Sequence, residues 1–175
     1  MDVLISADRI RERVDELGAE IATDFGDQPI TVVGVLTGCL VFLADLIRRL
    51  NHPTHIALLQ ASSYRGTATS PGQLQVRDEL LPDMTGRHVL LLDDILDTGQ
   101  TITRLVDFLT TKGTESVRTC VLLRKIGRQQ IPFEPDYVGF SIPDKFVVGY
   151  GLDFNDLYRH LPFIAVIPDS AAPES

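Results

Sequence analysis

Hydrophobic positions divide the first part of the chain into an amphipathic helix, a strand and a second helix. Ser6 is a favourable N-cap, and we predict that a helix begins there and ends near Gly26. Its apolar residues recur at helical spacing: Ile10, Val14, Leu17 and Ile21. The run Ile30 to Leu36 is β-branched and predicts a strand, after which Val41 to Leu50 returns to helical spacing.

The same order repeats further along the chain. His88 to Leu92 predicts a buried strand, Asp93 to Thr101 a charged turn, and Val117 to Leu123 a third strand. The helix between them has an apolar face: Ile102, Leu105, Val106 and Leu109. Near-continuous apolar strands that alternate with helices are typical of a parallel sheet covered on both faces. We therefore predict a doubly wound α/β fold, whose ligands bind at the carboxyl ends of the strands.

Two segments depart from this periodic pattern. Ile56 to Ser62 and Gln73 to Val76 could be strands, and they flank residues 63–72, which are small, polar and turn-forming. Such a segment is either solvated disorder or a flexible flap that orders on substrate. Residues 168–175 combine Pro, Ser, Ala and acids, so we predict one domain over residues 1–167 and a disordered tail.

Composition limits the possible partners. The chain has 175 residues, 44% of them hydrophobic, and a formal net charge of −8. This balance argues against a basic nucleic-acid-binding face, so any phosphate must be held locally. Cys39 and Cys120 lie in apolar runs and are expected to be buried free thiols. With no signal peptide or membrane-length apolar run visible, we expect a cytoplasmic protein that binds neither membrane nor nucleic acid.

The most informative stretch for chemistry is the end of the second predicted strand. Neighbouring side chains on a strand point to opposite faces, so Asp93 and Asp94 should diverge, one toward a sugar hydroxyl and the other toward a metal or second hydroxyl. Gly99 permits close backbone approach, and N–H groups at the following helix start can bind phosphate together with the hydroxyls of Thr98 and Thr101. A lone Asp-Thr-Gly is more often an acidic surface turn, but here the pattern is much longer.

This stretch resembles the diphosphoribosyl-binding signature of the type I phosphoribosyltransferases, with its hydrophobic run, acid pair and Asp-Thr-Gly-x-Thr. Three other segments resemble the hypoxanthine-guanine branch: Leu36-Thr-Gly-Cys39, Ser62-Ser-Tyr64 and Ile142 to Arg159. The likeness covers nearly the whole chain. It implies a small hood subdomain beside the sheet, and purine salvage by transfer of 5-phosphoribosyl from phosphoribosyl diphosphate to hypoxanthine or guanine. IMP or GMP and diphosphate would be the products, Mg²⁺ the cofactor, and a homodimer or homotetramer the assembly.

The resemblance also implies roles for individual residues. Phosphoribosyl diphosphate would be bound by Thr37, Gly38, Ser63, Tyr64, Asp93, Asp94, Asp97, Thr98, Gly99, Gln100, Thr101 and Arg159. The purine would be bound by Ile95, Lys125, Phe146, Val147 and Asp153. The metal would be held by Asp93, Asp94 and Asp153, and Asp97 would be the general base near the purine N7.

Purine selection would follow from three of these residues. Lys125 would donate to the six-position oxygen, Phe146 would stack on the ring and the Val147 carbonyl would accept from purine N–H groups. Adenine would set an amino group against Lys125, which pairs donor with donor. Taken singly, Lys125 is more often a solvated strand end, Phe146 a core residue and Asp153 a turn residue; only their matching places within one long pattern favour the site.

Several alternatives stay open. The family usually carries Lys or Arg where this chain has Thr37, and Arg65 is a hypothetical replacement for that charge. The relative use of hypoxanthine, guanine and xanthine is undecided, although we expect poor xanthine turnover. A regulator that keeps the phosphoribosyl diphosphate site but binds RNA or DNA is a second hypothesis, which the short, interleaved basic groups do not favour.

Overall fold

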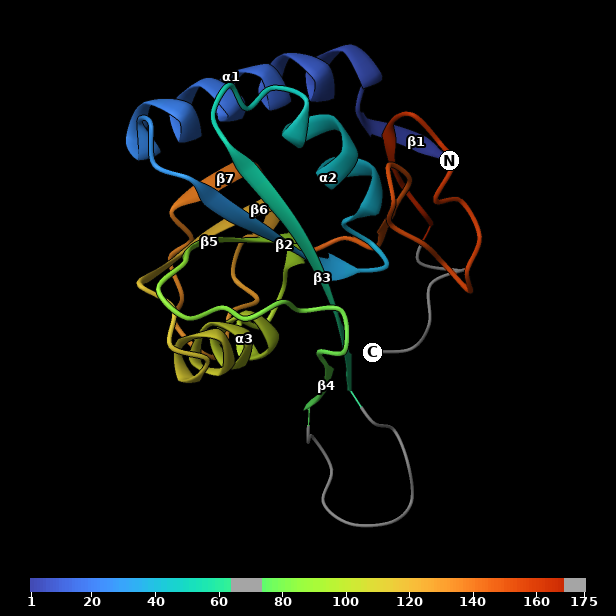
Figure 1. Cartoon of the computed structure of the whole chain (residues 1–175). Helices are drawn as coiled ribbons and strands as arrows, with labels where there is room; N and C mark the ends of the chain where they lie inside the picture. The colour runs from blue at the N-terminus through green and yellow to red at the C-terminus, as the bar shows by residue number, and fades with distance from the viewer. Residues whose placement is uncertain (64–73, 169–175) are drawn as a thin grey trace, which may run out of the picture.

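The computed structural model describes residues 1–63 and 74–168, and it contains a twisted six-stranded sheet with helices on both faces (Figure 1). Helices α1 (Ala7–Phe25) and α2 (Leu40–Ile47) cover one face, and α3 (Gln100–Thr111) covers the other. The strands are β2 (Ile30–Leu36), β3 (Thr54–Ser63), β4 (Leu74–Arg77), β5 (His88–Leu96), β6 (Ser116–Lys125) and β7 (Tyr137–Ile142). The predicted doubly wound α/β fold is confirmed.

The order of the strands marks where a ligand can bind. The sheet runs β4-β3-β2-β5-β6-β7, and all neighbours are parallel except β3 and β4. The chain leaves β2 in one direction toward β3, and β5 pairs on the other side of β2. The loops after β2 and β5 therefore meet at a topological switch point, where open α/β sheets bind ligands.

A second, smaller sheet joins the two ends of the described chain. Its order is β1-β9-β8, formed by β1 (Asp2–Ile5), β9 (Ile164–Val166) and β8 (Val147–Val148). Both pairings are antiparallel. This sheet is the expected hood, and β8 carries Val147 of the predicted purine site.

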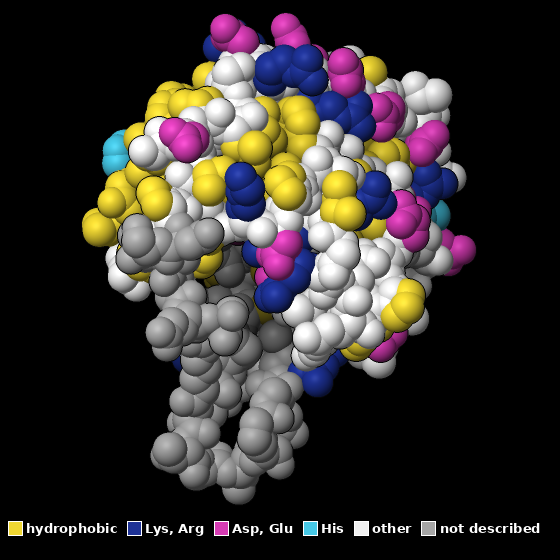
Figure 2. All heavy atoms as spheres, turned by 180° about the vertical axis from the view of Figure 1, so that it is seen from behind, with side chains coloured by type: hydrophobic (Ala, Val, Ile, Leu, Met, Phe, Trp, Pro, Cys, Tyr) yellow, Lys and Arg dark blue, Asp and Glu magenta, His cyan; other side chains and the backbone are white. Residues whose placement is uncertain are grey.

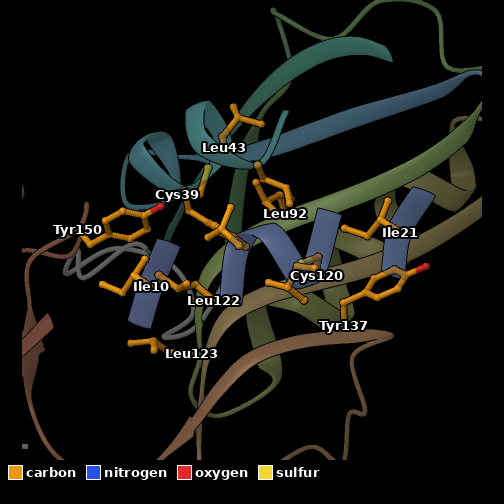
Figure 3. Packing of buried hydrophobic residues seen from close by; sticks show 14 of the residues in the cluster. Ile10, Ile21, Cys39, Leu43, Leu92, Cys120, Leu122, Leu123, Tyr137 and Tyr150 are labelled. Carbon is orange, nitrogen blue, oxygen red and sulfur yellow. The ribbon is translucent and has the colours of Figure 1, made fainter. Parts of the chain in front are cut away.

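Apolar side chains pack on each face of the large sheet. On the α1 and α2 side, Ile10 and Ile21 of α1 lie among Leu92 of β5 and Cys120 of β6 (Figure 3). On the α3 side, the buried residues of the helix are Ile102, Leu105 and Leu109, while Val106 is half-buried. Fully burying one such side chain stabilises the fold by about 1.5–3 kcal/mol, so the two clusters hold the strand ends in place.

Helix α1 has the predicted limits, but α2 is shorter than predicted. The Ser6 hydroxyl oxygen accepts a hydrogen bond from the Arg9 N–H at 3.4 Å and caps α1. Helix α2 ends at Ile47, whereas its apolar spacing predicted an end at Leu50. The last turn tightens, because the Leu50 N–H bonds to the Ile47 carbonyl three residues earlier.

Two strands are longer than their hydrophobic runs. Strand β5 was predicted to end at Leu92 but continues to Leu96, because the ladder to β6 pairs Asp93 with Val121 and Ile95 with Leu123. Backbone hydrogen bonds extend the strand even though its side chains turn acidic. Strand β6 likewise runs to Lys125, two residues beyond the apolar run.

Other predictions concern the cysteines, the flap and the tail. Both Cys39 and Cys120 are buried free thiols, as expected. Apart from Ser63 the flap of residues 63–72 lies outside the described residues, as do Tyr64, Arg65 and the tail from residue 169 onward. Within the described parts of the chain, no helix is long and apolar enough to cross a membrane.

Candidate active site

The loop after β2 packs tightly against the end of β5. A Cβ atom added at Gly38 would lie 1.6 Å from Oδ2 of Asp94, so any side chain at this position would displace the carboxylate. A Cβ at Gly151 would lie 2.1 Å from the Gly38 carbonyl oxygen, which brings the C-terminal loop onto the same spot. Thr37, which precedes Gly38, thus lies next to the acids of β5.

Asp93 and Asp94 diverge, as their adjacent positions predicted. Asp93 continues the α3 face of β5 and lines a cavity there, whereas Asp94 continues the opposite face and meets Gly38. The Asp93 side chain is almost fully buried, and its Oδ1 accepts the backbone N–H of Asp94 at 3.0 Å. Burial, and then repulsion from Asp94, raises the pKa of the Asp93 carboxyl well above its ordinary value. Burial also raises the pKa of Asp94.

Each of these two acids offers oxygen ligands to a divalent cation, but the structure does not bring the third predicted ligand to them. Asp93 is buried and Asp94 half-buried on opposite faces of β5, and a hard cation beside either carboxylate would offset the burial that raises its pKa. Asp153 instead forms an ion pair with Arg159 at 2.8 Å and accepts the Asp156 N–H at 2.8 Å. Among the described residues, no three His, Cys, Asp or Glu side chains gather into a metal-binding group.

The segment after β5 forms a compact loop at the start of α3. Gly99 has a φ of 84°, and a Cβ there would lie 2.4 Å from the Ile131 carbonyl oxygen. The N–H groups of Gln130 and Ile131 both donate to the Thr98 carbonyl, at 2.9 and 3.1 Å. The loop borders a cavity of about 60 Å³, lined by Asp93, Ile95, Leu96, Asp97, Thr98, Gly99, Thr101 and Ile102. Helix α3 begins at Gln100, so its N-terminal N–H groups lie at this loop, where that of Gln100 donates to the Thr98 hydroxyl oxygen at 3.4 Å.

Asp97 lies among charged side chains from two other segments. Its Oδ2 is 3.6 Å from Nζ of Lys125, and its Oδ1 accepts Nε–H of Arg128 at 2.9 Å. Asp144 lies beside the same two cations, 3.4 Å from Lys125 and 3.6 Å from Arg128. The Lys125 side chain is only 12% exposed, whereas those of Asp97, Arg128 and Asp144 are 36–48% exposed, so water screens the outer part of this group.

Sequence reasoning missed Arg128 and Asp144. Arg128 follows Lys125 by three residues, and Asp144 lies inside the Ile142 to Arg159 stretch, so both were close to residues that had been singled out. Neither belongs to a periodic pattern. Only the spatial meeting of the two loops shows that both face Asp97.

The other predicted purine-site residues lie around the start of β8. Phe146 is half-buried and meets Phe154 edge to face, with ring centroids 5.6 Å apart. Its own carbonyl accepts the Ile167 N–H at 3.0 Å. Val147 is buried in β8 opposite Val166. The fold therefore fixes the backbone at the residue whose carbonyl was expected to read the purine.

Arg159 connects the C-terminal loop to the acid pair. It donates to the Gly151 carbonyl at 2.7 Å and pairs with Asp153 and Asp156. Its charge favours the ionised form of Asp94, against the larger effect of burial that raises the pKa of this carboxyl. Since Thr37 carries no charge, Arg159 supplies positive charge at this end of β5.

Comparisons with known proteins agree with this geometry. Residues 6–155 match the family model of the phosphoribosyl transferase domain. A hypoxanthine-guanine phosphoribosyltransferase of Aquifex aeolicus is 41% identical over 170 residues, which cover 97% of this chain and 96% of that protein. The enzyme of the same name from Streptococcus pneumoniae is 38% identical over 95% of this chain and 93% of its own. A crystal structure of a Bacillus anthracis hypoxanthine-guanine phosphoribosyltransferase superposes with a TM-score of 0.90 at 38% identity, covering 96% of this chain and 99% of that one.

Proposed function

Because this chain belongs to the phosphoribosyltransferase family, we propose that it transfers the 5-phosphoribosyl group of phosphoribosyl diphosphate to hypoxanthine or guanine. The products are IMP or GMP and diphosphate, so the reaction is one of purine salvage. One observation supports this assignment most strongly. Nζ of Lys125 lies 3.6 Å from Oδ2 of Asp97, beside the loop at the start of α3, so a donor for O6 and an acceptor for N7–H stand together.

The loop from Thr98 to Thr101 binds the 5-phosphate in this proposal. Backbone N–H groups at the start of α3 and the threonine hydroxyls donate to its oxygens, which needs no lysine. The support is local: Thr98, Gly99 and Thr101 line one cavity, and the turn at Gly99 brings the backbone close. A strongly anionic substrate is thereby held by an acidic protein.

The bond changes involve the purine N9 and the ribose C1′. N9 forms a bond to C1′ as the bond from C1′ to the diphosphate oxygen breaks, with positive charge developing on the ribose. The purine then loses its N7 proton to the Asp97 carboxylate, which acts as general base. Nζ of Lys125 lies close to both Asp97 and Asp144. From this position it donates to O6 and stabilises negative charge on that oxygen as the proton leaves N7.

Lys125 also accounts for base selection. Hypoxanthine and guanine present an oxygen at position six, which accepts from Nζ. Adenine presents an amino group and would leave two donors facing each other in a pocket where Lys125 is largely buried. Phe146 stacks on the ring, and the Val147 carbonyl accepts hydrogen bonds from N–H groups at the edge of the purine. We expect xanthine to be a poor substrate.

Magnesium is the proposed cofactor, held on this chain by the carboxylates of Asp93 and Asp94. When bound, the ion neutralises diphosphate oxygens and stabilises the charge of the leaving group. The C-terminal loop supplies two further contacts in this proposal. Arg159 contacts the diphosphate, and Asp153 approaches the purine. Ile95, half-buried near the end of β5 and two residues before Asp97, completes the base pocket in this proposal.

We also propose a single domain over residues 1–167, a cytoplasmic location and a homodimer or homotetramer. Sedimentation would measure the oligomeric state.

The distribution of surface charge does not favour a nucleic-acid-binding regulator. On the face in Figure 2, the described Lys and Arg side chains are interspersed with Asp and Glu. Such mixing does not create the continuous basic stripe that binds a phosphate backbone.

Product chromatography tests the proposed function. The protein is incubated with phosphoribosyl diphosphate, hypoxanthine and magnesium, and IMP and diphosphate are quantified. We expect equal amounts of both products, and loss of both when EDTA removes the metal. Tight binding of phosphoribosyl diphosphate without nucleotide formation on either purine would contradict the proposal and favour a regulator.

A further inference from the structure

Four charged side chains form a closed group around Asp97. Lys125, at the end of β6, and Arg128, three residues later, each lie within 4 Å of both Asp97 and Asp144. The shortest of these contacts joins Nε of Arg128 to Oδ1 of Asp97, at 2.9 Å. The group contains two positive and two negative charges, so it is neutral as a whole.

The same segment that carries Arg128 also braces the proposed phosphate loop. Gln130 and Ile131 donate backbone N–H groups to the Thr98 carbonyl, and the side-chain amide of Gln100 donates to that of Gln130 at 2.7 Å. The Ile131 carbonyl lies so close to Gly99 that a side chain there would collide with it. Residues 127–131 therefore hold the backbone of the loop, whereas the Arg128 side chain alone reaches the carboxylate of Asp97.

We propose that Arg128 and Asp144 are positioning residues that set the orientation of the Asp97 carboxylate, an inference that rests on the proposed function. Arg128 holds Oδ1 and thereby leaves Oδ2 for the purine proton. The distance from Oδ2 to Lys125 is 3.6 Å, longer than a hydrogen bond, so this oxygen stays available. Asp144 competes with Asp97 for both cations and prevents them from holding the general base too tightly.

The two residues act on Asp97 in opposite directions. Arg128 and Lys125 attract its carboxylate, whereas Asp144, and Asp93 across the shared cavity, repel it. Removing Arg128 should therefore release Oδ1 and leave the carboxylate free to rotate, whereas removing Asp144 should leave both cations to Asp97 and hold it more tightly. A general loss of folding would impair substrate binding and turnover together, whereas a misplaced general base lowers turnover alone.

The test compares R128M with the control R124M. Arg124 lies near the end of β6, four residues before Arg128, and it contacts Glu134 and Ser141 and not Asp97. Both variants therefore lose one positive charge. For R128M we expect kcat to fall about tenfold or more and KM for phosphoribosyl diphosphate to stay within about twofold, whereas R124M should change neither. R128K should recover only part of the kcat, because lysine keeps the charge and loses the planar geometry that holds Oδ1.

D144N provides the second arm: it leaves both cations to Asp97, so we expect kcat to fall while KM for phosphoribosyl diphosphate again stays within about twofold. The inference is overturned if R128M matches R124M in both kcat and KM, or if R128M and D144N raise this KM as much as they lower kcat. Nucleotide formation by the wild-type protein separates the two proposals. An inactive wild type would overturn the proposed function, whereas an active wild type with an unaffected R128M would overturn this inference alone.

Discussion

The backbone N–H of Asp94 donates to Oδ1 of Asp93 at 3.0 Å, and this bond holds two adjacent acids at the buried end of β5. The bond only partly offsets the burial that raises the pKa of Asp93. A carboxyl whose pKa is higher in the folded state binds more protons there than in the unfolded chain. Its charge therefore costs stability once the pH exceeds its unfolded pKa, and that cost increases up to the folded pKa.

We predict that D93N is more stable than the wild type at pH 7, in the absence of metal and substrate, and that it is inactive. The gain in unfolding free energy should be about 1–2 kcal/mol, or a few degrees in Tm. It should shrink as the pH is lowered toward 4, where the wild-type carboxyl is protonated. Calorimetry measures the Tm of D93N against the wild type, with D8N, which changes an exposed acid, as the control. A D93N protein that is less stable than the wild type at every pH would contradict the prediction.

The sequence predicted the architecture because burial has a visible pattern. Near-continuous apolar runs such as Ile30 to Leu36 predicted a parallel sheet, and helical spacing predicted α1 from its Ser6 cap to Gly26. The end of β5 was placed too early because backbone hydrogen bonds, which carry no side-chain signal, extend it to Leu96. The two-residue strand β8 is too short to show any periodicity.

The candidate site was predictable only where residues are close along the chain. Asp93 to Thr101 form one continuous stretch, and the structure keeps most of them around one cavity. Contacts between segments that are far apart along the chain produce no recognisable pattern in the sequence. The approach of Gly38 to Asp94 and of Arg128 to Asp97 depends on how three loops meet.

Gly99 and Gly86 provide a matched pair of alanine substitutions. Both have positive φ values, 84° and 69°, so alanine costs about 1–2 kcal/mol at either site. Only at Gly99 would the new Cβ meet a neighbour, the Ile131 carbonyl at 2.4 Å, whereas Gly86 has open space. We predict that G99A raises KM for phosphoribosyl diphosphate about tenfold or more while G86A leaves it unchanged, as steady-state kinetics would measure; equal effects would count against a phosphate loop at Gly99.

Lys125 should determine the preference for a six-position oxygen. We predict that K125M lowers kcat/KM for hypoxanthine about 100-fold and barely changes the slow reaction with adenine, because the lost donor serves only the oxygen. K145M is the control, since Lys145 is exposed two residues before Val147. Rates with both bases for both variants test this, and a uniform loss with both bases would mean that Lys125 does not read position six.

Asp97 should matter for chemistry more than for binding. In D97N the amide cannot take the N7 proton, so we predict a fall in kcat of about 100-fold or more with KM for phosphoribosyl diphosphate nearly unchanged. D78N is a suitable control, because Asp78 has a similar side-chain exposure, 37% against 36%, and also pairs with a cation, Lys112. A D97N enzyme that loses substrate affinity but keeps its kcat would remove Asp97 from the role of general base.

The most direct measurement is diphosphate release from phosphoribosyl diphosphate and magnesium with five acceptors in parallel: hypoxanthine, guanine, xanthine, adenine and uracil. Lys125 beside Asp97 predicts rapid release with hypoxanthine and guanine, little with xanthine, release slower by orders of magnitude with adenine, and none above background with uracil. Comparable release with adenine or uracil, or no release with any base, would contradict the assignment of this site to 6-oxopurines.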